Sequence, residues 1–352
     1  MNYSFPKLLE TLVEGPERRL VLATIVEAEG STPQVVGASA IFSETGLEAG
    51  TVGGGILESR VESIAREALQ DGKARLVTFR LDANHSDMEG AICGGAARVL
   101  VDPGVGRGRA VFEKALKEIR RGGVGFLVAG MDPLEADRVA VKRSWLPYEE
   151  VFALKGADRP PVPLGFSDSE KDLRDPDLRK WGRYVFAELV VPLPRLIIAG
   201  AGHVGRAVAR LGRLLDFSVT VIDDRPEFAD KDRVPEADEI VVGDIEKSVR
   251  HVAESEDNYF VIVTRGHRKD GEALRAALKR PAAYVGMIGS KTKVETMRRE
   301  FLRAGWATEK EWAGICTPIG LDIGSKTVEE IAVSIAAQLI LVRSGRKSAW
   351  PL

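Results

Sequence analysis

The chain has 352 residues, with 50 Lys and Arg against 52 Asp and Glu and a formal net charge of -2. This length favours two domains, and the balanced charge argues against binding to nucleic acid or to an anionic membrane. The two cysteines are too few for a disulfide framework, and we find neither a signal peptide nor an apolar run long enough to cross a bilayer. We therefore expect a soluble cytoplasmic protein with no nucleic-acid or membrane partner.

The first hundred residues alternate predicted strands with glycine-rich turns. Apolar and β-branched runs predict strands at residues 20–27, 38–42, 75–81 and 97–101. Apolar residues at helical spacing predict a helix at residues 56–70, directly after Gly53, Gly54 and Gly55. Exposed N–H groups at such a strand-to-helix junction favour an anion, so we predict that these three glycines contact a cofactor. Glu58, in the first turn of this helix, is interpreted as structural.

Cys93 stands in another small-residue turn, followed by Gly94 and Gly95, which we also predict to contact the cofactor. The two glycines leave its sulfur sterically approachable, which makes the thiol a candidate nucleophile, persulfide carrier or soft-metal ligand. A buried, inert cysteine is the alternative. For Cys316 the same two alternatives, a reactive thiol or an inert one, stay open. The four histidines do not pair with cysteines or carboxylates at zinc spacing, so we predict no metal site.

Residues 105–190 carry a weaker signal. We predict a helix at 110–121, strands at 124–129 and 184–191, and a solvent-facing charged run at 167–183. The prolines at 192 and 194 indicate a joint. Residues 1–190 are therefore assigned to a mixed α/β N-terminal domain and residues 191–352 to a C-terminal domain.

From residue 195 onward, predicted strands and helices alternate, which is typical of a parallel sheet. Strands are expected at residues 196–199, 218–223, 239–242, 259–264 and 284–288, with helices at 270–278, 291–304 and 327–343.

The glycine motif at residues 200–205 has the context of a Rossmann dinucleotide-binding fingerprint. A strand precedes it, a helix follows, and a second strand ends at Asp223, about 20 residues beyond the loop. Gly200 permits the tight turn, Gly202 lets the backbone approach a phosphate, and Gly205 lets the helix pack on the sheet. We predict that this loop, including His203, holds a phosphate-bearing ligand. Asp223 is predicted to bind a ribose diol, with Asp224 competing for that role. A tight turn without ligand is the alternative.

Ser290 and Lys291 follow the last predicted strand and open a helix. We predict that both residues contact the cofactor, with Ser290 as the N-cap of the helix and Lys291 meeting a phosphate; an N-cap and a solvated lysine are the alternative. The GSKT sequence at 324–327 has a serine between glycine and lysine and no strand in front, so it is a helix start rather than a P-loop.

In their order along the chain, these motifs resemble the XdhC/CoxI family of xanthine dehydrogenase accessory factors. The resemblance rests on GSTP at 30–33, GTVGGGILE at 50–58, ICGG at 92–95, the loop at 200–205, GMIGSK at 286–291 and PIGLDIG at 318–324. Gln34, Ser39, Ala40, Val328 and Gln338 depart from the residues usual in the family.

The resemblance implies a Rossmann-like domain behind an XdhC/CoxI-type N-terminal domain, and a non-catalytic chaperone rather than an enzyme. Such proteins are thought to bind the molybdenum cofactor (molybdopterin or its dinucleotide form) and to hold it while it gains its sulfido ligand from a cysteine desulfurase. They then deliver it to the apoenzyme of a molybdenum hydroxylase. The resemblance also implies a homodimer, and it makes Cys93 a candidate sulfur or molybdenum contact.

Two other functions stay open at this point. The glycine loop and Asp223 favour an NAD(P)-dependent oxidoreductase, although no acid–base pair stands out. A regulatory protein that senses NAD(P) or another nucleotide is the third reading, because one fold hosts many functions.

Overall fold

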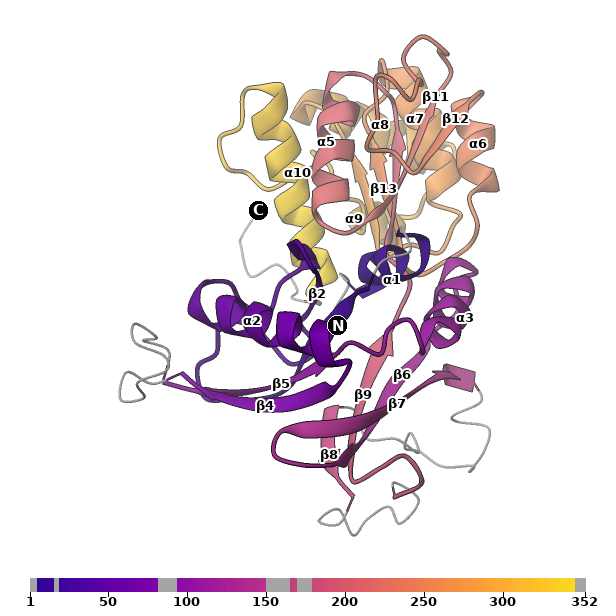
Figure 1. The fold of residues 1–352 in the computed structure, drawn as a ribbon. Coiled ribbons are helices and arrows are strands. Elements are labelled where there is room, and N and C mark those ends of the chain that lie inside the picture. Colours follow the sequence, from indigo (N-terminus) through magenta and orange to yellow (C-terminus); the bar gives the residue numbers. More distant parts are fainter. Residues whose placement is uncertain (1–4, 16–18, 82–93, 150–164, 170–178, 346–352) are drawn as a thin grey trace. The chain divides into compact units, whose positions relative to one another are not determined.

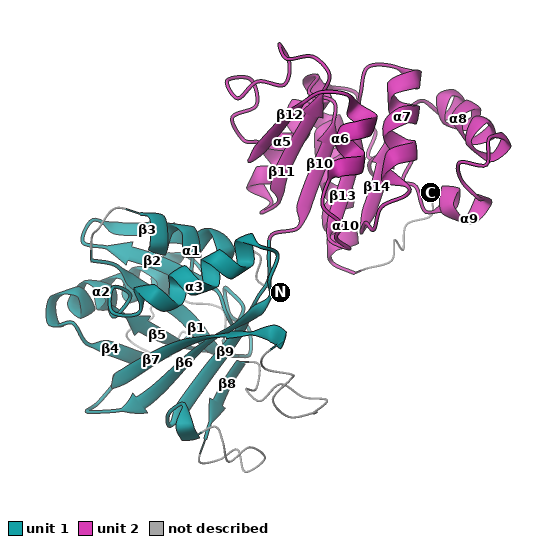
Figure 2. Cartoon of the chain, turned by 90° about the vertical axis from the view of Figure 1, so that its right-hand side faces the viewer, with its two compact units in different colours: residues 1–192 teal, residues 193–352 magenta. Residues whose placement is uncertain are grey.

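The computed structural model describes residues 5–15, 19–81, 94–149, 165–169 and 179–345. The chain divides into two compact units, residues 1–192 and residues 193–352 (Figure 2). Each unit is described by itself.

Unit 1 is built on a nine-stranded sheet in the order β3-β2-β1-β5-β4-β7-β6-β9-β8, and neighbouring strands are antiparallel. The strands are β1 (Val21–Glu29), β2 (Ser39–Ser43), β3 (Gly46–Gly50), β4 (Ala74–Arg80), β5 (Ala96–Asp102), β6 (Gly125–Pro133), β7 (Arg138–Pro147), β8 (Gly165–Asp168) and β9 (Tyr184–Val190). The helices described in this unit are α1 (Phe5–Glu14), α2 (Gly55–Asp71) and α3 (Arg109–Arg120).

The core of unit 1 forms where these helices cover the sheet. Leu57, Val61 and Ala65 of α2 pack in one cluster with alternate residues of β1, β2 and β5. A second cluster joins α1 and α3 to the intervening residues of the same strands, such as Leu22 of β1 and Ile41 of β2. Adjacent residues of β1 and β2 thus enter different clusters, as the side-chain alternation of strands requires.

Four of the described elements of unit 1 were not predicted from the sequence, namely α1, β3, β7 and β8. Strand β7 carries charged residues between its apolar ones, which hides its pattern. The expectation that residues 167–183 face solvent was wrong at Ser169, which is 6% exposed. Phe166 in β8 stacks on Tyr184, and Asp168 pairs with Arg183 at 2.9 Å, because β8 pairs with β9.

Unit 2 is a parallel sheet covered by helices on both faces (Figure 1). Its strands are β10 (Arg195–Ala199), β11 (Ser218–Asp223), β12 (Glu239–Val242), β13 (Asn258–Ile262) and β14 (Tyr284–Met287), in the order β12-β11-β10-β13-β14. Helices α5 (His203–Leu214) and α10 (Val328–Arg343) share one apolar cluster with the sheet. Helices α6 (Ile245–His251), α7 (His267–Ala277), α8 (Lys291–Arg303) and α9 (Glu309–Ala313) cover the other face. This topology confirms the predicted fold class, and the crossover between β10 and β13 is where such sheets bind ligands.

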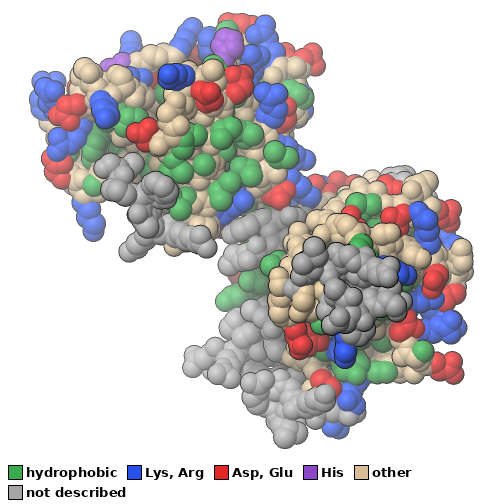
Figure 3. Space-filling model, turned by 90° about the vertical axis from the view of Figure 1, so that its left-hand side faces the viewer, with side chains coloured by type: hydrophobic (Ala, Val, Ile, Leu, Met, Phe, Trp, Pro, Cys, Tyr) green, Lys and Arg blue, Asp and Glu red, His purple; other side chains and the backbone are tan. Residues whose placement is uncertain are grey.

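Helix α10 is apolar on its outer face as well as on its buried face. Val333 and Ile340 are 50% and 42% exposed, and Leu214 at the end of α5 is 75% exposed. Apolar side chains gather on the face of unit 2 that Figure 3 shows. As predicted, α10 begins beyond the GSKT sequence, and Thr327 and Glu330 form its capping box. Among the described residues, no helix combines the length and apolar character needed to cross a bilayer.

Candidate functional site

The glycine loop connects β10 to α5, and two of its glycines are required by packing. Gly200 has a φ of +115°, and an added Cβ would lie 2.5 Å from the carbonyl oxygen of Val263. A Cβ on Gly205 would lie 1.8 Å from the carbonyl oxygen of Gly200. Both positions are therefore closed to any side chain, as the sequence predicted for a tight turn and close helix packing.

Gly202 differs from its two neighbours in the motif. Its φ of -69° is open to any residue, and no heavy atom lies within 4 Å of an added Cβ. It is the N-cap residue of α5, and no side chain caps the first N–H groups of the helix. His203, the first residue of α5, is exposed beside it. Local packing does not explain this glycine, whereas the approach of a ligand does.

Asp223, at the end of β11, is buried and already bound. Its carboxylate accepts hydrogen bonds from the N–H of Ala201 at 2.7 Å and from Arg225 Nε and Nη2, both at 2.9 Å. Burial by itself raises the pKa of this carboxyl, but the bonds from Arg225 and Ala201 outweigh it and hold the pKa below its usual range. Asp223 therefore fixes the glycine loop, and a ribose would have to displace one of its donors. Its role toward a ribose stays a prediction.

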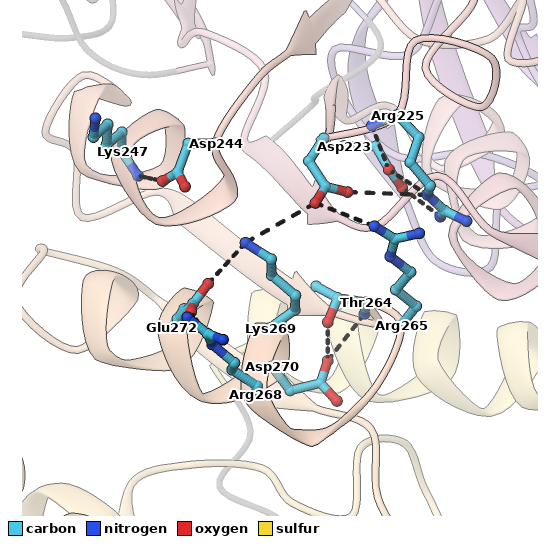
Figure 4. A network of polar contacts seen from close by, with 11 residues as sticks. Asp223, Arg225, Asp244, Lys247, Thr264, Arg265, Arg268, Lys269, Asp270 and Glu272 are labelled. Carbon is cyan, nitrogen blue, oxygen red and sulfur yellow. Dashed lines mark hydrogen bonds and ion pairs between the residues drawn. The ribbon is translucent and has the colours of Figure 1, made fainter.

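Asp224 is the more accessible acid at the same strand end. Its carboxylate is 22% exposed and makes long ion-pair contacts, at 3.5 Å to Arg265 Nη2, 3.9 Å to Lys269 Nζ and 4.0 Å to Arg225 Nε. Arg265, in the loop before α7, and Lys269, in the first turn of α7, both reach toward the end of β11 (Figure 4). Asp224 is thus an acceptor that a polar ligand can reach, with three cations beside it.

A buried acid beyond the end of β13 was missed in the sequence. Asp270 is fully buried, and its carboxylate accepts hydrogen bonds from the N–H of Thr264 at 3.0 Å and from the Thr264 hydroxyl at 2.7 Å. Lys293 of α8 pairs with its other oxygen. Burial raises the pKa of Asp270, although these partners favour its ionised form. The available signal was an acid in the first turn of the helix that follows a strand of this sheet.

Ser290 and Lys291 lie where β14 leads into α8. The Ser290 side chain caps the helix by accepting a hydrogen bond from the N–H of Lys293 at 3.3 Å. Lys291 is exposed at the first helical position. The capping role of Ser290 agrees with its predicted structural reading, and a phosphate contact by either residue stays a prediction.

The glycine turns of unit 1 pack directly on one another. A Cβ on Gly95 would lie 2.4 Å from the carbonyl oxygen of Ser31, and one on Gly53 would lie 2.8 Å from Pro33 Cβ. The turns around Gly30, Gly53 and Gly95, which are far apart in the sequence, therefore form one cluster. By contrast, Gly54, Gly55 and Gly94 have open space around them and φ values of +67°, +56° and +68°.

Glu58 has the structural role expected of it. Its carboxylate accepts hydrogen bonds from the Thr51 hydroxyl at 2.6 Å and from the N–H of Val52 at 3.2 Å, which ties the turn at 51–55 to α2.

The structure describes only one of the two cysteines, Cys316. Cys93 lies outside the described residues, so its predicted role stays a prediction. Cys316 is partly buried, its backbone bridges to Gly286, and burial raises the pKa of its thiol. A thiol with a raised pKa forms little thiolate, which favours the inert reading for Cys316. Within the described ranges, no group of three or more His, Cys, Asp or Glu side chains is arranged to hold a metal ion.

The strand order, the glycine loop and the acid that fixes it define unit 2 as a Rossmann-type domain. Residues 196–339 match the XdhC Rossmann domain, and residues 15–80 match the XdhC and CoxI family. The chain belongs to the XdhC and CoxI family.

Named relatives agree with this assignment. The chain is 26% identical to a Bacillus subtilis protein described as a probable xanthine dehydrogenase subunit, over 97% of this chain and 98% of that protein. It is also 26% identical to the uncharacterized protein YqeB of Escherichia coli, but it spans only 43% of YqeB's length. A crystal structure described as a xanthine dehydrogenase from Bacillus halodurans matches with a TM-score of 0.75 and 28% identity, over 98% of this chain and 97% of that one.

Proposed function

We propose that this protein is an accessory factor for a molybdenum hydroxylase of the xanthine dehydrogenase type. It binds the molybdenum cofactor, as molybdopterin or its dinucleotide form, holds it during sulfuration and passes it to the apoenzyme. Family membership and the names of the relatives from B. subtilis and B. halodurans support the link to xanthine dehydrogenase.

The observation that carries the proposal is the open space at Gly202. Two glycines of the loop are glycine because a Cβ would collide, whereas Gly202 is glycine beside empty space at the start of a helix. A phosphate seated there accepts hydrogen bonds from the free N–H groups and is favoured by the helix dipole. The cofactor carries such a phosphate, so the loop fits its phosphate end.

The surroundings of the loop also fit an anionic ligand that bears hydroxyl groups. Arg265 is 60% exposed and Lys269 is 26% exposed, and both flank the reachable carboxylate of Asp224. When bound, the cofactor supplies the molybdenum chemistry of the client enzyme. The residues of this chain bind and orient it.

The partners follow from this function. They are the hydroxylase apoenzyme, a cysteine desulfurase as sulfur donor and a second copy of the chain. The exposed apolar face of α10 supports a protein partner for unit 2, because large apolar side chains gathered on one surface mark interaction sites. In this proposal Cys93 contacts the sulfur or the molybdenum.

The proposal is tested by purifying the protein without oxygen from a host that makes the molybdenum cofactor, and by measuring bound molybdenum and pterin. Wild type should carry both and should raise the activity of the client hydroxylase. Cys93→Ala should keep the pterin and lose the sulfuration-dependent part of the activation. Wild-type protein with neither molybdenum nor pterin, and without effect on the hydroxylase, would contradict the proposal.

The dinucleotide fingerprint specifically favours a second candidate, an NAD(P)-dependent oxidoreductase. Titration with NADH, followed by its fluorescence, separates the two functions. Tight binding together with substrate-dependent oxidation would replace the first proposal, whereas tight binding without turnover would favour a nucleotide sensor.

A further inference from the structure

We propose that unit 1 holds a second anion site, which binds a phosphorylated small molecule about the size of a nucleotide. The site is a cavity of about 790 Å³. Three segments line it, namely the turn between α2 and β4, the loop from β5 into α3, and the β6–β7 turn with the start of β7. All three belong to unit 1, whereas the glycine loop belongs to unit 2.

The charge of the lining is strongly unbalanced. Five cationic side chains face two carboxylates, although the whole chain is slightly acidic. The cations are Lys73, Arg107, Arg138, Lys142 and Arg143. One of the two carboxylates, Asp102, is already used by Arg143 at 2.9 Å and by the N–H of Gly104 at 2.7 Å. A concave surface with this surplus of positive charge raises the local concentration of anions.

Arg143 is the most buried cation of the lining. Its side chain is only 7% exposed, Nε is bound to Asp102, and Nη2 is shut off from solvent without a hydrogen-bond partner in the described structure. The anion is therefore bound by the exposed cations of the cavity, which are Lys73, Arg107 and Lys142. Guanidinium groups such as that of Arg107 match the oxygens of phosphate well.

The start of α3 also lies at this cavity. Gly108 is the N-cap residue of this 12-residue helix, and both Gly108 and Val111 line the cavity. The N–H groups of Gly108, Arg109 and Val111 already donate to backbone carbonyl oxygens, so the start of the helix contributes its dipole rather than a set of free donors.

The remaining lining indicates the class of ligand. Val111, Leu134, Val139 and Val141 give the cavity an apolar wall, and Leu134 is 62% exposed. A few charged groups beside apolar side chains, in a cavity of a few hundred Å³, are typical of small-molecule sites. The ligand therefore combines one or two phosphates with an apolar or aromatic part.

The test is calorimetric titration of the full chain with inorganic pyrophosphate and, separately, with ADP. Arg107→Gln combined with Lys142→Gln removes two exposed charges from the cavity. The matched control is Lys117→Gln, which removes one exposed charge at the other end of α3. Gly202→Ala blocks the glycine loop of unit 2, so that titration of this variant measures binding to the cavity of unit 1 alone.

We expect the cavity variant to bind pyrophosphate at least tenfold more weakly in the Gly202→Ala background, and Lys117→Gln to bind like its parent. ADP should bind more tightly than pyrophosphate because it uses the apolar wall. Thermal unfolding followed by circular dichroism checks that each variant is folded. If the double variant does not fold, Lys142→Glu, a single substitution at an exposed residue, replaces it in the titration. Unchanged affinity in the folded cavity variant, or no binding in the Gly202→Ala background, would overturn the proposal.

Discussion

The glycine loop of unit 2 and the basic cavity of unit 1 present two different ways to receive an anion. The loop offers neutral N–H groups at the start of α5, and the buried carboxylate of Asp223 holds it in place. The cavity offers cationic side chains from three separate segments. Backbone donors act only at contact, whereas charges act over about 10 Å and are screened by salt. The two sites should therefore respond differently to mutation, pH and salt.

The largest expected effect is on the fold of the loop itself. Gly205→Ala should destabilise unit 2 by about 3 kcal/mol or more, because the new Cβ would lie 1.8 Å from the carbonyl oxygen of Gly200. Urea unfolding followed by circular dichroism measures the loss. A midpoint equal to that of wild type would show that packing does not require this glycine.

A smaller loss is expected from Asp223→Asn, which removes the charge that holds Arg225 and the N–H of Ala201. We expect about 2 kcal/mol at neutral pH, less than for a fully buried pair because Arg225 is partly exposed. The folded pKa of Asp223 is lowered, so its contribution is present above the unfolded value of about 3.9 and is lost as pH falls through the folded pKa. Unfolding measured from neutral to acidic pH should show the advantage of wild type shrinking below about pH 4. A difference independent of pH would contradict this account.

Salt distinguishes the two sites by a factor of about ten in affinity, or about 1.4 kcal/mol. Raising NaCl from about 50 to about 500 mM should weaken pyrophosphate binding to the cavity by that amount or more. Binding at the glycine loop should change less, since backbone N–H groups hold the phosphate at Gly202 in our proposal and the nearby cations Arg265 and Lys269 flank Asp224. Titration of Gly202→Ala and of the cavity variant over this range measures each site alone. If the affinities of the two sites fell equally with salt, the two sites would not differ in how they bind an anion.

The smallest expected effect is on stability in Gly202→Ala. Alanine is a poorer N-cap than glycine, but it also reduces the entropy of the unfolded chain, so the two changes largely offset each other. Urea unfolding should give a change within about 1 kcal/mol of wild type. A larger loss would mean that Gly202, like Gly205, serves the fold.

The same contrast explains what could be predicted from the sequence. The glycine loop was found because its strand, turn, helix and acid follow one another in a single unit from β10 to β11. The basic cavity was not found because Lys73, Arg107 and Lys142 meet only through the pairings of β4 with β5 and β7. Strand β7, which brings three of its cations, was itself missed because charged residues interrupt its apolar pattern. Asp223 was placed correctly at its strand end, but the bonds that occupy it depend on where Arg225 folds back.

The central claim is that the glycine loop is kept open for the phosphate of the molybdenum cofactor. Its most direct test is the molybdenum and pterin content of Gly202→Ala and wild type, purified side by side without oxygen from a host that makes the cofactor. We predict that the variant keeps the fold and stability of wild type and loses most of the bound pterin and molybdenum. Equal retention by both proteins would contradict the claim.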